Sequence, residues 1–269
     1  MRRTAGFASY IAVALLAAIA GALGAWVWRD ESRPFGQDQA TTHGEWVWIR
    51  RGPDSVRAYA AYPERRDPAP AVIVIHENQG LTAWEPTVAD RLAANGLVAL
   101  AVDMLSSRFG TTPPTPDSAR RLIGQLTPEG TTADLNAAYE YLNTLPAVQK
   151  DRIGVIGFCW GGARSFQYAT NNPRLRAAVV CYGSAPDSAA MGRIQASVLG
   201  VYGENDARIN AALPDVEARM KALGKRFEHD VYPGTGHGFL KPGRQGNDTD
   251  QPDKAWTRIL GFFKAELNR

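Results

Sequence analysis

The sequence alternates between short, continuously apolar runs and segments with a helical pattern. The apolar runs are Ala71–Ile75, Leu97–Val102, Ile153–Ile156, Ala177–Cys181 and Val198–Tyr202. Runs of this kind are typical of strands that are buried on both faces of a parallel sheet. Alternation of strands with helices places helices on both faces of that sheet. We therefore expect an α/β fold with a mainly parallel central sheet.

The remaining elements complete a single domain. Trp46–Ile49 and Val56–Tyr62 flank a Gly-Pro-Asp turn, which predicts an antiparallel pair at the N-terminal end of the sheet. A last strand is expected at Phe227–Tyr232. Helices are expected at Thr82–Asn95, Ser118–Leu126, Thr132–Leu145 (with Thr131 and Thr132 as candidate caps), Cys159–Thr170, Ala211–Leu223 and Asp253–Leu267. We expect this domain to span residues 46–269, a normal size for one domain.

The first 28 residues have the pattern of a targeting segment. Arg2 and Arg3 precede a charge-free stretch, Ala5–Trp28, which as a helix would be about 36 Å long and could cross a bilayer core of about 30 Å. It is either a cleaved secretory signal, with a small-x-small site at 22–24, or an N-terminal membrane anchor with Trp26 and Trp28 at the interface. Residues 29–45 are polar and predict a linker. In both cases we expect an exported, periplasmic or extracytoplasmic domain.

Composition excludes several classes of protein. The net charge is +3 and is not clustered, so no nucleic-acid partner is expected. Two cysteines cannot form a disulfide-rich scaffold or a four-cysteine zinc site. We expect no cofactor and no metal, and we expect a monomer that meets a membrane only through its N-terminal segment.

A cysteine flanked by glycines follows the apolar run Ile153–Ile156. A nucleophile on a sharp strand-to-helix turn needs small neighbours, and Gly157 and Gly161 supply them around Cys159. Such a turn would place the thiol at a helix N-terminus, where the thiolate is favoured. The alternatives are a packing cysteine or a phosphate-binding glycine loop, although Gly154 and Gly157 lack the spacing of a dinucleotide fingerprint.

The nucleophile needs a base, and four histidines are available. His237 lies in a glycine-rich loop after the last expected strand, where an imidazole can reach over the edge of the sheet. His43 falls in the predicted linker, His76 ends a strand and His229 lies within a strand pattern. His237 is therefore the predicted base, and a loop histidine without a role is the alternative.

An acidic turn at the end of a buried strand offers the residue that orients the base. Asp206 is the predicted acid; Glu204 is the alternative, and an exposed capping acid without a catalytic role is another. The chain order Cys159, Asp206, His237 is the order of nucleophile, acid and histidine in α/β-hydrolases.

The turn after Ala71–Ile75 has a second set of candidate residues. His76-Glu77 lacks the second histidine of a zinc-protease helix, because position 80 is glycine. In an α/β-hydrolase this turn supplies one oxyanion amide, here near Asn78, and the residue after the nucleophile, Trp160, supplies the other. Glu77 would lie at the floor of the site, where a half-buried carboxylate is costly unless it has a role.

Four segments together resemble the dienelactone hydrolase family. They are Gly-Phe-Cys-Trp-Gly-Gly at 157–162, Gly-Glu-Asn-Asp at 203–206, Gly-Thr-Gly-His-Gly-Phe at 234–239 and His-Glu-Asn-Gln-Gly at 76–80, and the similarity spans about residues 45–267. The resemblance implies a triad of Cys159, His237 and Asp206. It also implies a glutamate, Glu77, that holds the resting thiol and helps to ionise it when substrate arrives.

The resemblance further implies cations that hold a substrate carboxylate. Arg108 lies just past the strand Leu97–Val102, where one is expected, and Lys241 follows His237 by four residues. Lysine keeps the charge of an arginine but loses its bidentate geometry. Asn78-Gln79 stands where the family usually has an apolar pair.

These observations predict a hydrolase with the α/β-hydrolase fold. We expect carboxymethylenebutenolidase-like cleavage of a small carboxylic ester or lactone, with a thioester formed on Cys159. One alternative is a broad esterase or thioesterase without a preference for a carboxylate, and another is a non-catalytic envelope binding protein. Cys181 is expected to be a core residue, and a disulfide with Cys159 is its alternative.

Overall fold

A computed structural model describes residues 42–269. The predicted targeting segment at 1–28 and most of the linker predicted at 29–45 lie outside these residues. Within the part that is described, no helix has both the length and the apolar character needed to cross a membrane.

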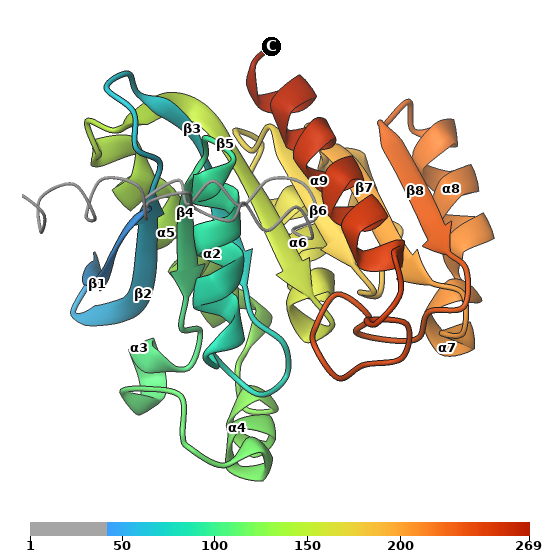
Figure 1. Ribbon diagram of the computed structural model, residues 1–269, viewed down its shortest axis with the longest axis horizontal. Coiled ribbons are helices and arrows are strands. Elements are labelled where there is room, and N and C mark those ends of the chain that lie inside the picture. Colours follow the sequence, from blue (N-terminus) through green and yellow to red (C-terminus); the bar gives the residue numbers. More distant parts are fainter. Residues whose placement is uncertain (1–41) are drawn as a thin grey trace, which may run out of the picture. The chain divides into compact units, whose positions relative to one another are not determined.

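One eight-stranded sheet organises the described chain, in the order β1-β2-β4-β3-β5-β6-β7-β8 (Figure 1). β1 is antiparallel to β2 and β2 to β4, and all other neighbours are parallel. The strands are β1 His43–Arg51, β2 Asp54–Tyr62, β3 Ala69–Ile75, β4 Val98–Val102, β5 Val148–Phe158, β6 Ala177–Cys181, β7 Ser197–Gly203 and β8 Phe227–Tyr232. The predicted fold class, including its antiparallel N-terminal end, is confirmed.

Helices cover both faces of this sheet. α2 and α9 lie on the near face in Figure 1, and α5, α6 and α8 lie on the other. The helices are α2 Trp84–Ala94, α3 Ser106–Phe109, α4 Pro116–Ile123, α5 Pro128–Thr144, α6 Trp160–Asn171, the short 3-10 helix η1 Met191–Arg193, α7 Ala207–Asn210, α8 Leu213–Ala222 and α9 Gln251–Leu267.

Two apolar cores follow from the alternation of side chains along each strand. Ile73 and Ile75 of β3 point into the core beneath α5, α6 and α8, whereas Val72 and Val74 point into the core beneath α2 and α9. All seven residues of β3 are buried. Since burial of one such aliphatic side chain contributes about 1.5–3 kcal/mol, the apolar runs strongly favour the position of this strand between two helix layers.

Among the boundaries that differ from the sequence prediction, those of β1 and α5 change the interpretation of the chain. β1 begins at His43, so residues 43–45 belong to the sheet and not to the linker. α5 begins at Pro128, whose fixed φ suits the first helical position, and the hydroxyl of Thr127 accepts the Gly130 amide. Thr131 and Thr132 do not cap the helix as predicted, because their hydroxyls lie inside it and donate to carbonyls one turn earlier.

Candidate active site

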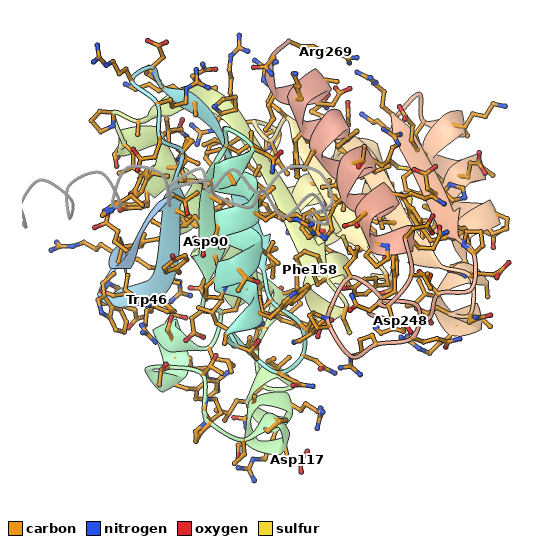
Figure 2. All side chains as sticks on the ribbon, viewed as in Figure 1. Trp46, Asp90, Asp117, Phe158, Asp248 and Arg269 are labelled. Carbon is orange, nitrogen blue, oxygen red and sulfur yellow. The ribbon has the colours of Figure 1, made fainter. Side chains whose placement is uncertain are left out.

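The backbone turns sharply at Cys159, between β5 and α6. Cys159 has φ 56° and ψ −112°, a conformation that non-glycine residues rarely adopt, and its amide donates to the Cys181 carbonyl over 3.0 Å. Strain of this kind costs about 1–3 kcal/mol and is typical of functional positions. Cys159 is half-buried, and Phe158 before it is buried at the carboxyl end of β5 (Figure 2). The turn therefore presents the thiol above the sheet edge.

Close backbone contacts explain the glycines around this turn. A Cβ on Gly157 would lie 1.9 Å from the Gly161 carbonyl oxygen. A Cβ on Gly161 would lie 2.4 Å from the carbonyl oxygens of Ile75 and His76, on the neighbouring strand and its turn. Both side-chain positions are thus filled by backbone, and the turn is compatible with glycine alone.

The structure brings His237 and Asp206 together. His237 Nδ1 lies 2.5 Å from Asp206 Oδ2, and Asp206 is 7% exposed. Asp206 stands at the N-cap of α7, where its carbonyl accepts the Asn210 amide. Glu204, the alternative acid, is directed to the Gly234 amide at 2.9 Å. The acid in contact with the imidazole is therefore Asp206.

The environment of His237 favours its protonated form. Hydrogen bonding to Cys159 is the largest cause that raises the pKa of His237 to about 9; burial opposes this, and the hydrogen bond to Asp206 adds to it. The ring of Tyr182 meets the imidazole edge-on with centroids 5.1 Å apart. His237 is thus positioned between the thiol, the carboxylate and an aromatic ring.

Glu77 and Lys241 form an ion pair at the same edge. Lys241 Nζ lies 3.2 Å from Glu77 Oε2, and the two side chains are 17% and 4% exposed. The ammonium also lies 5.0 Å from the centre of the Trp84 ring. Glu77 raises the pKa of both Cys181 and Tyr182, after burial, which is the larger cause. The predicted carboxylate and the predicted cation are therefore neighbours that neutralise each other.

Two amides at this edge are free of protein acceptors. Asn78 follows β3 and Trp160 is the first residue of α6. Among the described residues, neither amide donates a hydrogen bond to another protein group. Amides without a protein acceptor are what an oxyanion hole requires.

Arg108 has its contacts away from Cys159, Asp206 and His237. Its guanidinium donates to the Gln125 carbonyl over 2.5 Å and lies over the ring of Phe109. It lines a separate cavity together with Arg51 and Asp134. Its role as a ligand for a substrate carboxylate stays a prediction.

Two residues near the site were not assigned a role from the sequence. Tyr182, with φ 40°, is wholly buried, and its ring contacts His237. His76 accepts the Met104 amide at Nε2 and contacts the Glu77 carbonyl through Nδ1, so it ties the end of β3 to the end of β4. The sequence feature that could have identified both residues is their position directly after a buried strand.

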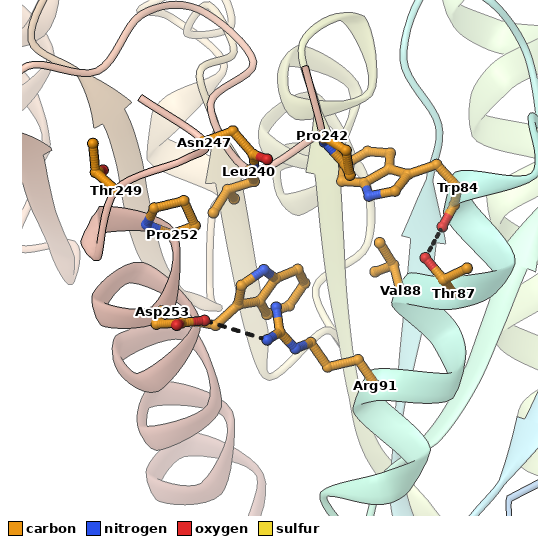
Figure 3. A pocket seen from close by; sticks show the side chains of 11 residues that line it. Trp84, Thr87, Val88, Arg91, Leu240, Pro242, Asn247, Thr249, Pro252 and Asp253 are labelled. Carbon is orange, nitrogen blue, oxygen red and sulfur yellow. Dashed lines mark hydrogen bonds and ion pairs between the residues drawn. The ribbon is translucent and has the colours of Figure 1, made fainter. Parts of the chain in front are cut away.

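A cavity of about 330 Å³ adjoins the site and shares Trp84 with it (Figure 3). α2, α9 and the loop between β8 and α9 line it, with Trp84, Trp256 and Arg91 on its walls. The Arg91 guanidinium lies over Trp256 and reaches Asp253 at 3.6 Å. Within residues 42–269, no group of three or more His, Cys, Asp or Glu side chains could hold a metal ion.

Comparison with known proteins identifies the family. The profile of the dienelactone hydrolase family matches residues 56–267. The chain belongs to the dienelactone hydrolase family. It is accordingly a dienelactone hydrolase-like enzyme, a carboxylic ester hydrolase, with the α/β-hydrolase fold.

Individual relatives agree with this membership. A protein of Methylorubrum extorquens named "Putative carboxymethylenebutenolidase" is 29% identical over 222 residues, which cover 78% of this chain and 76% of that protein. A Bradyrhizobium protein named "Probable 2-oxo-3-(5-oxofuran-2-ylidene)propanoate lactonase" is 30% identical over 83% of this chain and 94% of its own. The crystal structure of a "Putative Dienelactone Hydrolase" from Klebsiella pneumoniae subsp. pneumoniae has a TM-score of 0.75 at 26% identity, with 83% and 98% covered.

Proposed function

We propose that this dienelactone hydrolase-like enzyme cleaves a small ester or lactone through a Cys159-His237-Asp206 triad. The observation that supports it best is the placement of His237 between Asp206 and the thiol at the strained turn. A thiolate paired with an imidazolium is a nucleophile that needs no further base before it attacks.

The first half-reaction forms a thioester. The Cys159 sulfur attacks the carbonyl carbon, and the carbonyl π electrons move to oxygen, which the amides of Asn78 and Trp160 stabilise. As the oxyanion collapses, the carbon–oxygen bond to the alcohol breaks and the His237 imidazolium gives its proton to that oxygen. In a lactone the alcohol stays attached to the acyl group.

The second half-reaction restores the enzyme. Neutral His237, oriented by Asp206, takes a proton from water, whose oxygen attacks the thioester carbonyl. Collapse of the second oxyanion breaks the carbon–sulfur bond, releases a carboxylic acid and leaves the Cys159 thiolate beside the imidazolium. Between turnovers the proton would return from His237 to the sulfur, and Glu77, with Lys241 balancing its charge, would hold this resting thiol until the next substrate arrives.

Removal of the nucleophile tests this proposal. Cys159→Ala should abolish hydrolysis of p-nitrophenyl acetate, because the attacking sulfur is lost, while the circular dichroism spectrum stays native. Cys181→Ala is the matched control, since it removes the other thiol and should keep measurable turnover. Turnover like the wild type in Cys159→Ala would refute the triad, whereas a wild-type protein that turns over no ester or lactone would leave the non-catalytic binding protein as the better description.

A second candidate function is a broad esterase or thioesterase without a preference for a carboxylate. It is favoured by the contacts of the two candidate cations, since Lys241 is paired with Glu77 and Arg108 with the Gln125 carbonyl.

Kinetics of Lys241→Met on matched acidic and neutral esters separate the two functions. If Lys241 holds a substrate carboxylate, kcat/KM should fall about tenfold or more for the acidic ester alone, the cost of one charge-assisted contact. If both esters change equally, the broad esterase is correct.

We also propose that the domain works outside the cytoplasm, on the strength of the apolar segment at 5–28 and its preceding arginines. Cell fractionation, with the intact mass of the recovered protein, checks the location and shows whether the segment is cleaved.

A further inference from the structure

Two tryptophans stand out on the edge strand β1. Trp46 and Trp48 are 48% and 60% exposed, and they are large apolar side chains on β1, which has a strand neighbour on one side only among residues 42–269. Because they are two residues apart, both point to the same face of the sheet. Figure 2 shows Trp46 on this hairpin, at the side of the domain next to α2. Large apolar side chains that are exposed side by side mark a candidate interaction surface.

Two arginines and a tyrosine are the neighbours of these indoles on the same face. Trp46 lies opposite Tyr59 and Trp48 opposite Arg57 in the β1–β2 register. The Arg57 guanidinium lies 3.8 Å from the centre of the Trp46 ring, and exposed Arg50 follows Trp48 on the same face. We call this set the tryptophan face: Trp46, Trp48, Arg50 and Arg57.

The acidic residues of the hairpin lie at positions of the opposite face. Glu45 accepts a hydrogen bond from Tyr62, and Asp54 pairs with Arg51. Asp90 of α2 borders the tryptophan face and accepts the Tyr59 hydroxyl over 3.0 Å. The face therefore presents indole rings and guanidinium groups together, which suits the headgroup region of an anionic bilayer.

The position of β1 in the chain indicates that a membrane surface is within reach of the tryptophan face. Only residues 29–42 separate the predicted membrane segment from the first residue of β1. Fourteen residues span at most about 50 Å when fully extended. A segment held in a bilayer would thus keep the first residue of this hairpin within about 50 Å of the bilayer surface.

We propose that the tryptophan face docks on the anionic membrane surface to which the N-terminal segment tethers the domain. The docking rests on the anchor interpretation of residues 1–28, in which this segment is not cleaved, and it is independent of the proposed hydrolysis. The Arg57 carbonyl accepts the Asp103 amide at the carboxyl end of β4, so the tryptophan face borders the sheet edge that carries Cys159. Docking would hold the active site near the bilayer.

Two quenchers of tryptophan fluorescence test the docking on the full chain in vesicles of phosphatidylglycerol and phosphatidylcholine. Trp26→Phe/Trp28→Phe removes the indoles of the N-terminal segment and is the reference protein. The test protein adds Trp46→Phe/Trp48→Phe, which leaves Trp84, Trp160 and Trp256. Brominated phosphatidylcholine reports indoles in the lipid, and acrylamide reports indoles in water. Turnover of p-nitrophenyl acetate, which these changes should not alter, checks the fold.

We expect brominated lipid to quench the reference protein and the test protein to lose most of that quenching. The difference should shrink in vesicles without phosphatidylglycerol, because the guanidinium groups then lose their partners. Equal quenching of both proteins by brominated lipid would overturn the proposal. So would indoles open to acrylamide, which would mean a face in water, or indoles shielded from both quenchers, which would mean coverage by a second copy or by residues 29–41.

Discussion

At the scale of single residues, the protonation of His237 depends most on Cys159. The contact with the thiol is the largest cause of a pKa near 9, ahead of the contact with Asp206, while burial acts in the opposite direction. Because the folded pKa lies above the ordinary value of about 6.5, this arrangement stabilises the fold fully below pH 6.5. That stabilisation is lost as the pH rises through 9.

We predict that Cys159→Ala lowers the pKa of His237 towards 6.5. The variant removes the contact with Cys159, which raises the pKa of His237 most. Burial, which lowers this pKa, and the hydrogen bond to Asp206, which raises it, then remain and oppose each other. Titration of the His237 ring by two-dimensional NMR measures this directly, with Cys181→Ala as the control that should keep a value near 9. An unchanged pKa in Cys159→Ala would show that the thiol and the imidazole do not interact.

At the scale of elements, a buried carboxylate joins the β1–β2 hairpin to two helices. Asp134 of α5 is 2% exposed, pairs with Arg51 of β1 over 2.7 Å and accepts the hydroxyl of Ser107 of α3. Burial is the dominant cause and raises the pKa of Asp134 to about 6, although Ser107 and Arg51 lower it. At neutral pH, Ser107 and Arg51 therefore only partly offset the cost of burying the charged carboxylate.

This pKa predicts a pH-dependent stability. The folded protein binds the Asp134 proton more tightly than the unfolded chain does, so the free energy of unfolding should fall as the pH rises from about 4 to 6. A shift of two units corresponds to about 3 kcal/mol. Urea titrations should show this extra fall in the wild type and in the exposed-site control Asp117→Asn, but not in Asp134→Asn. Parallel pH profiles for all three proteins would contradict the prediction.

The positions of the strands could be predicted from the sequence more accurately than the ends of the strands and the caps of the helices. The buried strands could be predicted because their apolar runs leave no other burial pattern. β5 begins at Val148, earlier than the predicted Ile153. The prediction began the strand too late because exposed Lys150 and Asp151 interrupt the apolar pattern that it relied on. The cap at Thr127 was not predicted because Thr131 and Thr132 are equally suitable cap residues by type. Only the backbone, which becomes helical at Pro128, shows that Thr127 is the cap.

At the scale of the whole molecule, parallel strands collect distant residues at one edge. The ends of β3, β5, β7 and β8 lead to Glu77, Cys159, Asp206 and His237. The Cys159 turn was predictable because backbone contacts at Gly157 and Gly161 leave no room for a Cβ. The Glu77–Lys241 pair joins residues 164 apart, and its formation depends on side-chain directions that no local pattern encodes.

The thioester is the central claim, and mass spectrometry of the acyl-enzyme tests it most directly. Wild-type enzyme mixed with p-nitrophenyl acetate and quenched in acid during turnover should gain the mass of one acetyl group. Proteolysis should locate that group on the peptide containing Cys159, in a form that neutral hydroxylamine removes. An acetyl group on another residue, or turnover with no acyl-enzyme and full activity in Cys159→Ala, would contradict the account.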